Sequence, residues 1–166
     1  MTPLKIMAPH ESLHSLVQPG AEDEWCSFND EQEGFRKALY DWSDRVGGVD
    51  LTKRWMCLAL WGDSAPYSRN DSVLLLTMRV LNGDHRRRIW ISALSKTNLC
   101  ACGCYGRHTF DALFAILAWS MRALLQRVWP ATDHLGRSWP EDSWRARVAN
   151  QPMRFGASVI AKCGDW

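Results

Sequence analysis

The stretch of sequence that decides the fold consists of two β-rich runs, Ser72-Val-Leu-Leu-Leu-Thr-Met-Arg-Val-Leu81 and Arg88-Ile-Trp-Ile-Ser-Ala-Leu94, joined through Asn82-Gly83-Asp84. Branched and large apolar side chains of this kind favour extended strands. An Asn-Gly pair between two such runs is typical of a β-hairpin, because its turn needs positive φ at both central residues. The sequence therefore predicts two neighbouring antiparallel strands.

Further strands and a long helix are predicted on either side of this hairpin. Before it, Met56 to Trp61 is a short apolar run that is closed by Gly62-Asp63. After it come an apolar helical stripe, Thr109 to Val128, and a fourth strand, Arg154 to Cys163, that is closed by Gly164-Asp165. The predicted fold class is α/β, with a mixed sheet in β-β-β-α-β order. A helix between strands of one sheet normally makes a parallel crossover, so the first and fourth strands should be parallel neighbours.

The 166 residues are enough for one domain with a sizeable core. Residues 51–166 are predicted to form this α/β domain. Residues 1–50 are predicted to be an N-terminal extension with one amphipathic helix, whose apolar face consists of Phe35, Leu39, Trp42 and Val46. The prolines and the acidic cluster within residues 1–30 indicate an irregular segment before that helix.

The composition indicates a folded chain without a strong overall charge. Apolar residues make up 46% and charged residues 23%, near the globular average, and the net charge is +2. Any affinity for nucleic acid must therefore come from a local patch. The most apolar stretch, 112–121, is far shorter than the roughly 20 residues of a membrane span, so we expect no membrane contact. Without a secretory signal, an intracellular location in the nucleus or cytoplasm is expected.

Tryptophan is unusually frequent, with ten residues in the chain. Most are predicted to lie in the core or at its rim, because an indole carries a large apolar area. The alternative, a series of stacking platforms for single-stranded nucleic acid, would need a regular array, and the sequence spacing shows no period. Arg86, Arg87 and Arg88 leave two interpretations open, a phosphate contact or a charged turn that keeps the hairpin soluble.

Six cysteines without a secretory context are expected to be thiols or metal ligands rather than a disulfide framework. Cys100, Cys102, Cys104 and His108 lie within nine residues, and four soft ligands are sufficient for a tetrahedral zinc ion. The Cys-x-Cys-x-Cys spacing departs from that of zinc fingers, where at least two residues separate paired cysteines. A loop of reduced thiols before the helix therefore stays as the alternative.

The predicted order of elements resembles the first half of the ribonuclease H-like fold, whose superfamily includes integrases and cut-and-paste transposases. The resemblance implies one catalytic aspartate on the first strand and another after the fourth, and the matching positions are Asp63 and Asp165. Both would hold Mg²⁺ for phosphodiester transfer on DNA. The superfamily also requires a third acid on a later helix, so we expect a truncated chain that is inactive alone. Gly-Asp is ordinary turn chemistry as well, which leaves a structural role open for both aspartates.

A second resemblance covers residues 61–166. The string Trp61-Gly-Asp-Ser-Ala-Pro-Tyr67, the block from Leu99 to Ser120 and the closing Gly164-Asp-Trp166 resemble repeated, uncharacterised reading frames of dinoflagellate-type algae, which look derived from mobile elements. In those frames the chain continues further, which again predicts truncation. A sheet without a following helix would leave apolar area around Trp61, Val159 and Trp166 open for self-association.

Two functional hypotheses follow from these patterns. The first is a fragment of a transposase- or integrase-like nuclease, with Asp63 and Asp165 as its metal ligands and DNA as its partner. The second is a non-enzymatic, cysteine-rich interaction module, in which the segment from Cys100 to His108 binds zinc.

Overall fold

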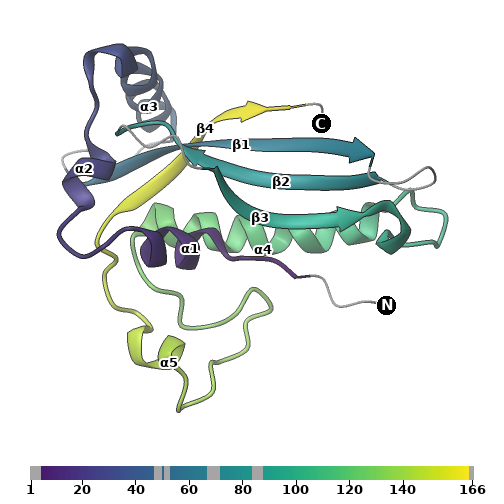
Figure 1. Ribbon diagram of the computed structural model, residues 1–166. Coiled ribbons are helices and arrows are strands. Elements are labelled where there is room, and N and C mark those ends of the chain that lie inside the picture. The colour runs from purple at the N-terminus through teal and green to yellow at the C-terminus, as the bar shows by residue number, and fades with distance from the viewer. Residues whose placement is uncertain (1–4, 47–49, 51–52, 67–71, 84–87, 165–166) are drawn as a thin grey trace.

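The fold is organised around one sheet. The computed structural model describes residues 5–46, 50, 53–66, 72–83 and 88–164. Figure 1 shows the sheet with a long helix beneath it and a shorter helix above one end. The strands are β1 (Trp55–Pro66), β2 (Ser72–Val80), β3 (Arg88–Ser95) and β4 (Gly156–Cys163). The helices are α1 (Pro9–Leu16), α2 (Glu22–Cys26), α3 (Glu33–Val46), α4 (Arg107–Gln126) and α5 (Trp144–Val148), with short 3-10 turns η1 (Asp30–Gln32) and η2 (Lys96–Asn98).

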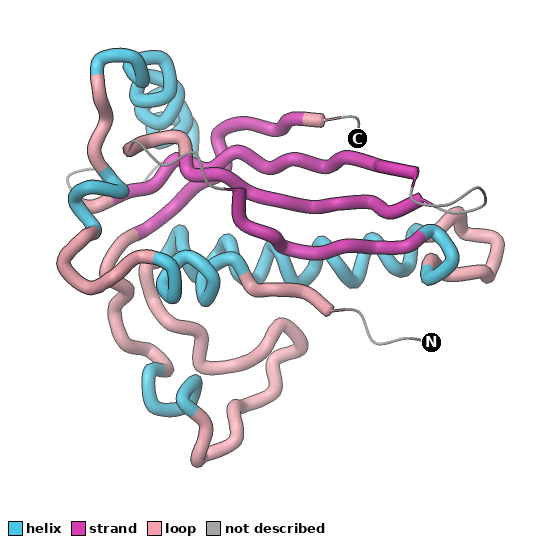
Figure 2. Tube along the Cα trace, in the orientation of Figure 1, coloured by secondary structure: helices cyan, strands magenta, loops and turns pink. Residues whose placement is uncertain are grey.

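The four strands lie in the order β3-β2-β1-β4. β1 is antiparallel to β2, β2 is antiparallel to β3, and β1 is parallel to β4. The predicted antiparallel pair and the predicted parallel pairing of the first and fourth strands are therefore confirmed, and with them a mixed α/β sheet. The chain passes from β3 to β4 through α4 and a long, mostly irregular connection, which is drawn in pink below the sheet in Figure 2.

β1 is longer than the sequence predicted. It was expected to end at Trp61, with Gly62-Asp63 as a closing turn, but it continues to Pro66. The reason is β2, which pairs with β1 along the whole of this additional stretch. Only the pairing with β4 stops earlier, at Trp61 opposite Cys163. Gly62 and Asp63 are therefore strand residues, at the point where β1 loses its β4 neighbour.

The connection between β2 and β3 differs from the predicted two-residue turn. Residues 81–87 separate the strands, and 84–87 lie outside the described part of the chain. Asn82 is fully buried, and its side-chain oxygen accepts a hydrogen bond from the Cys57 N–H at 2.8 Å. Its side-chain amide donates to the Trp55 carbonyl, also at 2.8 Å. The Asn82 side chain thus takes the place of a strand backbone and extends the pairing along β1.

The main core lies between the sheet and α4. Met56, Leu58 and Met78 point toward α4 and are completely buried. Burying a side chain of this size stabilises the fold by roughly 1.5–3 kcal/mol. The predicted apolar helix is confirmed, although it begins at Arg107 rather than Thr109. No described helix combines the length and the apolar character that crossing a bilayer requires, α4 with its 20 residues included.

Two short helices occupy a segment that we predicted to be irregular. Pro9 lies in the first turn of α1, where the N–H that proline lacks would have no helical partner. The backbone N–H of His10 donates to Oγ of Ser120 at 3.0 Å, and Nδ1 of His10 lies 2.7 Å from the same oxygen. Leu13 and Val17 join the main core. An isolated helix of this length is unstable, so α1 depends on contacts with α4 that a local pattern cannot reveal.

Two arginines fasten the connection between α4 and β4 to the N-terminal helices. Arg145 of α5 donates to both carboxylate oxygens of Glu11, at 2.5 and 2.8 Å. Arg154 donates to Glu22 at 2.7 Å and to the carbonyl of Val17 at 2.8 Å. These two cations are therefore neutralised inside the fold and tie segments together that lie more than a hundred residues apart in the chain.

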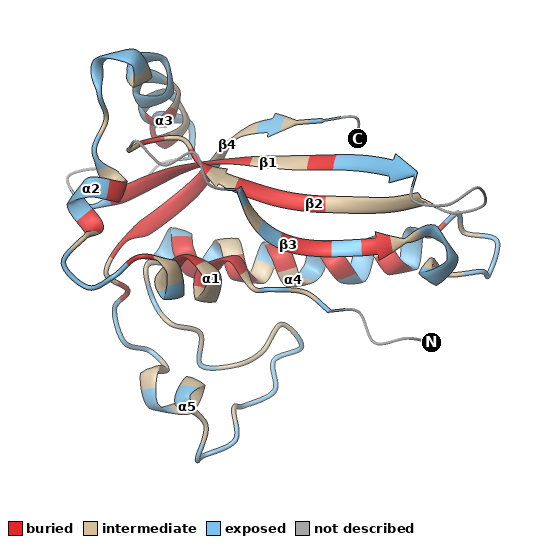
Figure 3. Cartoon of the chain, viewed as in Figure 1, coloured by how far each residue is buried: buried red, intermediate tan, exposed pale blue. Residues whose placement is uncertain are grey.

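The opposite face of the sheet is covered at one end by α3. Leu39 of α3 packs in a second, smaller core with Trp55 and Cys57 of β1. The predicted helix over residues 30–46 is confirmed as η1 followed by α3, but Phe35 and Val46 of its predicted apolar face are 39% and 52% exposed. Their exposure follows from the position of α3, which Figure 3 shows above one end of the strands only.

Acid should destabilise this fold through two histidines. Burial lowers the pKa of His10 and of His14 to about 4, whereas both would titrate near 6.5 in the unfolded chain. The unfolded state therefore binds more protons below pH 6.5, and the stability that is present above this pH is lost as the pH falls toward 4. A change of this size in pKa corresponds to about 3 kcal/mol per histidine, so we expect the free energy of unfolding, measured with urea, to fall by roughly 3–6 kcal/mol over this range.

His14→Phe is the control for this prediction. The His14 ring is stacked on Phe155, with ring centroids 4.0 Å apart, so a phenyl ring can take its place without a titrating group. The variant should lose less stability between pH 6.5 and 4 than the parent chain. Equal losses in both proteins would show that His14 does not contribute to the acid sensitivity.

Candidate metal centre

The loop between η2 and α4 carries the cysteine block. Three of its residues have positive φ: Gly103 at 85°, Tyr105 at 53° and Gly106 at 82°. Glycine adopts this conformation without strain, whereas a side chain at such an angle costs about 1–2 kcal/mol. Gly106 is also the N-cap of α4. These reversals fold the short segment from Cys100 to Cys104 back toward the first turn of α4.

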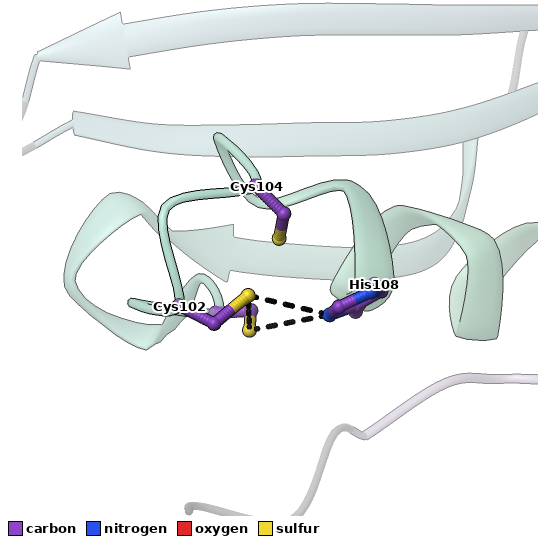
Figure 4. A group of neighbouring side chains, drawn as sticks. Cys102, Cys104 and His108 are labelled. Atoms are coloured by element: carbon purple, nitrogen blue, oxygen red, sulfur yellow. Dashed lines mark hydrogen bonds between the residues drawn. The ribbon is translucent and has the colours of Figure 1, made fainter.

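The four predicted ligands converge in space. The Sγ atoms of Cys100, Cys102 and Cys104 and a ring nitrogen of His108 all lie within 4.8 Å of one another. Nδ1 of His108 lies 3.4 Å from Cys102 Sγ and 3.7 Å from Cys100 Sγ, and the two sulfurs are 3.0 Å apart. Figure 4 shows the side chains of Cys102, Cys104 and His108 pointing toward a common centre.

This arrangement is close to what a tetrahedral metal site needs. With Zn–S near 2.3 Å and Zn–N near 2.0 Å, sulfur atoms would be about 3.8 Å apart and a sulfur and a nitrogen about 3.5 Å apart. The distances from His108 to Cys100 and Cys102 already match, the sulfurs of Cys100 and Cys102 would have to separate by less than about 1 Å, and ligand atoms as far apart as 4.8 Å would have to approach by about 1 Å. The unusual Cys-x-Cys-x-Cys spacing is therefore no obstacle, because the positive φ of Gly103 reverses the chain inside the block. The group could hold a metal such as zinc.

Hydrogen bonds within the cluster favour deprotonated thiols. The thiol and backbone N–H of Cys102, together with His108, lower the pKa of Cys100 to about 6. The backbone N–H of His108 lowers the pKa of Cys104. The hydrogen bond that the Cys102 thiol donates to Cys100 raises the pKa of Cys102 to about 11. The hydrogen bond between His108 and the Cys100 sulfur raises the pKa of His108. Cys100 is therefore the thiol that loses its proton most easily, and His108 is shifted toward its protonated form.

α4 anchors the cluster at its first turn. Thr109 lies in this turn, and its side-chain oxygen accepts a hydrogen bond from the Cys100 N–H at 3.0 Å. The backbone N–H of Thr109 bonds to the carbonyl of Gly106 at 2.9 Å. Thr109 is buried. One end of the cysteine block is therefore fixed to the same helical turn that presents His108.

The other cysteines stand apart from this cluster. The six cysteines form no disulfide within the described residues, and the described metal-ligand group includes neither Cys57 nor Cys163. Burial raises the pKa of Cys26 and of Cys57 to about 12. Buried thiols of this kind are inert toward metals and oxidants, so Cys26 and Cys57 take no part in the chemistry of the loop before α4.

The predicted pair of aspartates is only half described. Asp63 is exposed on β1 and lies opposite Leu75 of β2, and Asp165 lies outside the described residues. Gly164 nevertheless lies directly against Gly62, since a Cβ atom on Gly164 would be 2.1 Å from the Gly62 carbonyl oxygen. The residues that immediately precede the two aspartates are therefore neighbours. Asp63 belongs to no group of three or more potential metal ligands within the described chain.

Comparison of the chain with protein-family models, with curated proteins and with solved structures gives no match in any of the three. The functional argument therefore depends on the geometry of the residues themselves.

The structure also contains a cavity that no sequence pattern predicted. It has a volume of about 770 Å³ and is lined by residues that include Glu11, His14, Trp129, Trp144 and Arg154. Its walls come from α1, from the long connection and from the approach to β4, so only the tertiary fold assembles them. Glu11 and Arg154 are already engaged in ion pairs, and the cavity therefore offers no uncompensated charge that would define a ligand.

Gly106→Ala should change the conformation of the loop between Cys100 and His108. A Cβ atom at this position would meet Leu99 at 3.1 Å and would have to adopt a φ of 82°. We expect a loss of roughly 1–2 kcal/mol in the free energy of unfolding, together with weaker binding of zinc. Gly136→Ala is the matched control, because Gly136 has a φ of 79° and no atom within 4 Å. Equal effects of both substitutions on zinc affinity would show that the loop geometry does not matter.

Proposed function

We propose that this chain is a zinc-binding interaction module, in which the metal fixes the loop from Cys100 to His108 onto the first turn of α4. The observation that carries the proposal is the convergence of four ligand atoms within 4.8 Å. Three thiols and one imidazole are a donor set that suits zinc, whereas Mg²⁺ prefers oxygen ligands. Four protein ligands fill a tetrahedral site, which is typical of a structural rather than a catalytic zinc ion.

Zinc at this position would couple the loop to the core. The ligands lie on both sides of Gly106, and α4 continues from His108 into residues that pack beneath the sheet. Metal binding would therefore stabilise the whole domain, because the unfolded chain lacks the assembled site. The same loop carries Tyr105, which is 98% exposed. A metal-fixed loop can hold such an aromatic side chain ready for a partner without a large loss of entropy on binding.

Zinc binding can be tested on the intact chain. After removal of adventitious ions, the protein should take up about one equivalent of zinc. At a thousandfold excess over Kd, zinc should stabilise it by about 4 kcal/mol, or roughly 10 °C in Tm. The combined variant Cys102→Ser and Cys104→Ser should lose both effects, and Cys163→Ser, outside the cluster, should keep both. Failure of the parent chain to retain zinc would contradict the proposal.

A second candidate is the nuclease-like function, with DNA as substrate. The strand order β3-β2-β1-β4, with β1 parallel to β4, supports the resemblance to the ribonuclease H-like fold. The contact between Gly62 and Gly164 supports the pairing of Asp63 with Asp165, which directly follow them. Two carboxylates would bind a divalent ion weakly, because Mg²⁺ keeps its waters unless its ligands are nearly octahedral.

Metal binding separates this candidate from a purely structural role for Asp63 in β1. Titration with Mn²⁺ should broaden the NMR signals of residues 62–64 and of Gly164 before others, and Asp63→Asn should abolish this effect. Asp44→Asn, an exposed change on α3, is the control. Broadening that is the same in Asp63→Asn and in the parent chain would exclude an ion at this position.

A further inference from the structure

The open face of the sheet carries a row of aromatic side chains. Thr77 of β2 pairs with Trp61 of β1 on one side and with Trp90 of β3 on the other. Cross-strand partners point to the same face of a sheet, and alternate strands lie about 9.5 Å apart. The sheet register therefore places two indoles on either side of one short side chain.

A second row on the same face contains two arginines. Arg79 of β2 pairs with Ala59 of β1 and with Arg88 of β3. Arg79 lies two residues beyond Thr77 on one strand, so the aromatic row and the arginine row are adjacent. The guanidinium carbon of Arg88 lies 5.3 Å from the centre of the Trp61 ring, a cation–π contact that links the two rows.

Both rows face away from α4. Leu60, Met78 and Ile89, which alternate with the row residues along their strands, pack in the core on the α4 side. α3 and the segment before it reach the strands at the end that contains Trp55 and Cys57. Trp90 is 53% exposed. Figure 3 shows that, in the described part of the chain, this half of the face has no helix over it.

The two arginines lack the carboxylate partners that other arginines of this protein have. Arg54, Arg145 and Arg154 each bind a carboxylate. Within the described residues no ion pair involves Arg79 or Arg88, and Nε of Arg79 is buried without a hydrogen-bond partner. The described strand residues supply one carboxylate to this face, that of Asp63, and the aromatic row lies between this carboxylate and the arginine row.

We propose that this face binds single-stranded nucleic acid, with bases stacked on Trp61 and Trp90 and phosphates held by Arg79 and Arg88. The exposed Trp90 ring can stack on any base, and the half-buried Trp61 ring offers a second contact together with the Arg88 guanidinium that lies over it, because bases also stack on guanidinium planes. The adjacent cations follow the nucleic-acid backbone. A duplex keeps its bases stacked on one another, so it cannot use the indoles. A second copy of the chain fits less well, because a two-fold contact through this face would bring the same arginines together. The proposal is independent of zinc and of Asp63.

Fluorescence anisotropy with labelled oligonucleotides of about 12 residues tests the proposal, with single-stranded DNA, single-stranded RNA and a duplex as separate arms. We expect at least one single strand to bind more tightly than the duplex and to quench tryptophan fluorescence. Trp90→Ala should weaken single-strand binding roughly tenfold. Arg88→Ala should weaken single-strand binding. It should also lower the slope of log K against log salt concentration by about one, because one phosphate contact is lost.

Trp144→Ala and Arg147→Ala, on α5 and away from the sheet, are the matched controls and should leave binding unchanged. Urea unfolding verifies that each variant is folded, and Trp90 and Arg88 are exposed enough to be replaced without loss of the core. Equal affinity for duplex and single strand, or unchanged binding by Trp90→Ala, would overturn the proposal. So would a concentration-dependent dimer that Trp90→Ala dissolves while no oligonucleotide binds, since a second copy would then occupy the face.

Discussion

The pairing of β1 between β2 and β4 is the constraint on which the rest of the structure depends. Its buried half, from Trp55 to Ala59, has partners on both edges and cores on both faces. Because β4 is parallel to β1, the chain must cross back to the start of the sheet before β4 begins, and α4 makes this crossing. The same pairing sets Gly164 against Gly62 and leaves the outer half of β1 with β2 as its only neighbour in the described chain.

α4 connects the candidate metal centre to this constraint. Its first turn carries His108 and Thr109, and its later turns fill the core beneath β1 and β2. The loop before it contains three positive φ values and has one exposed aromatic side chain, so packing alone gives it little stability. A metal ion bound by the ligand set that closes on the first helical turn would supply the cross-link that packing does not.

Sequence patterns predicted the parts of the fold that local chemistry determines. The strands, the α4 helix and the Cys100 to His108 group follow from apolar runs and from ligand spacing. The missed features depend on distant residues: α1 is held by Ser120, which lies 110 residues from His10, and the length of β1 is set by β2. Asn82 has the identity of a turn residue, but its side chain bonds to β1. The turn pattern at Gly62-Asp63 failed for the same reason, since a neighbouring strand overrode it.

The two faces of the sheet also show why composition alone could not indicate a surface function. A net charge of +2 excludes a strong overall field, but the charges are distributed unevenly. Several arginines are neutralised by carboxylates where segments meet, as Arg145 is by Glu11, whereas Arg79 and Arg88 have no such partner on the open face within the described residues. Trp61 and Trp90 lie far apart in the sequence and show no period there. The strand register alone, through Thr77, places both indoles beside the two arginines.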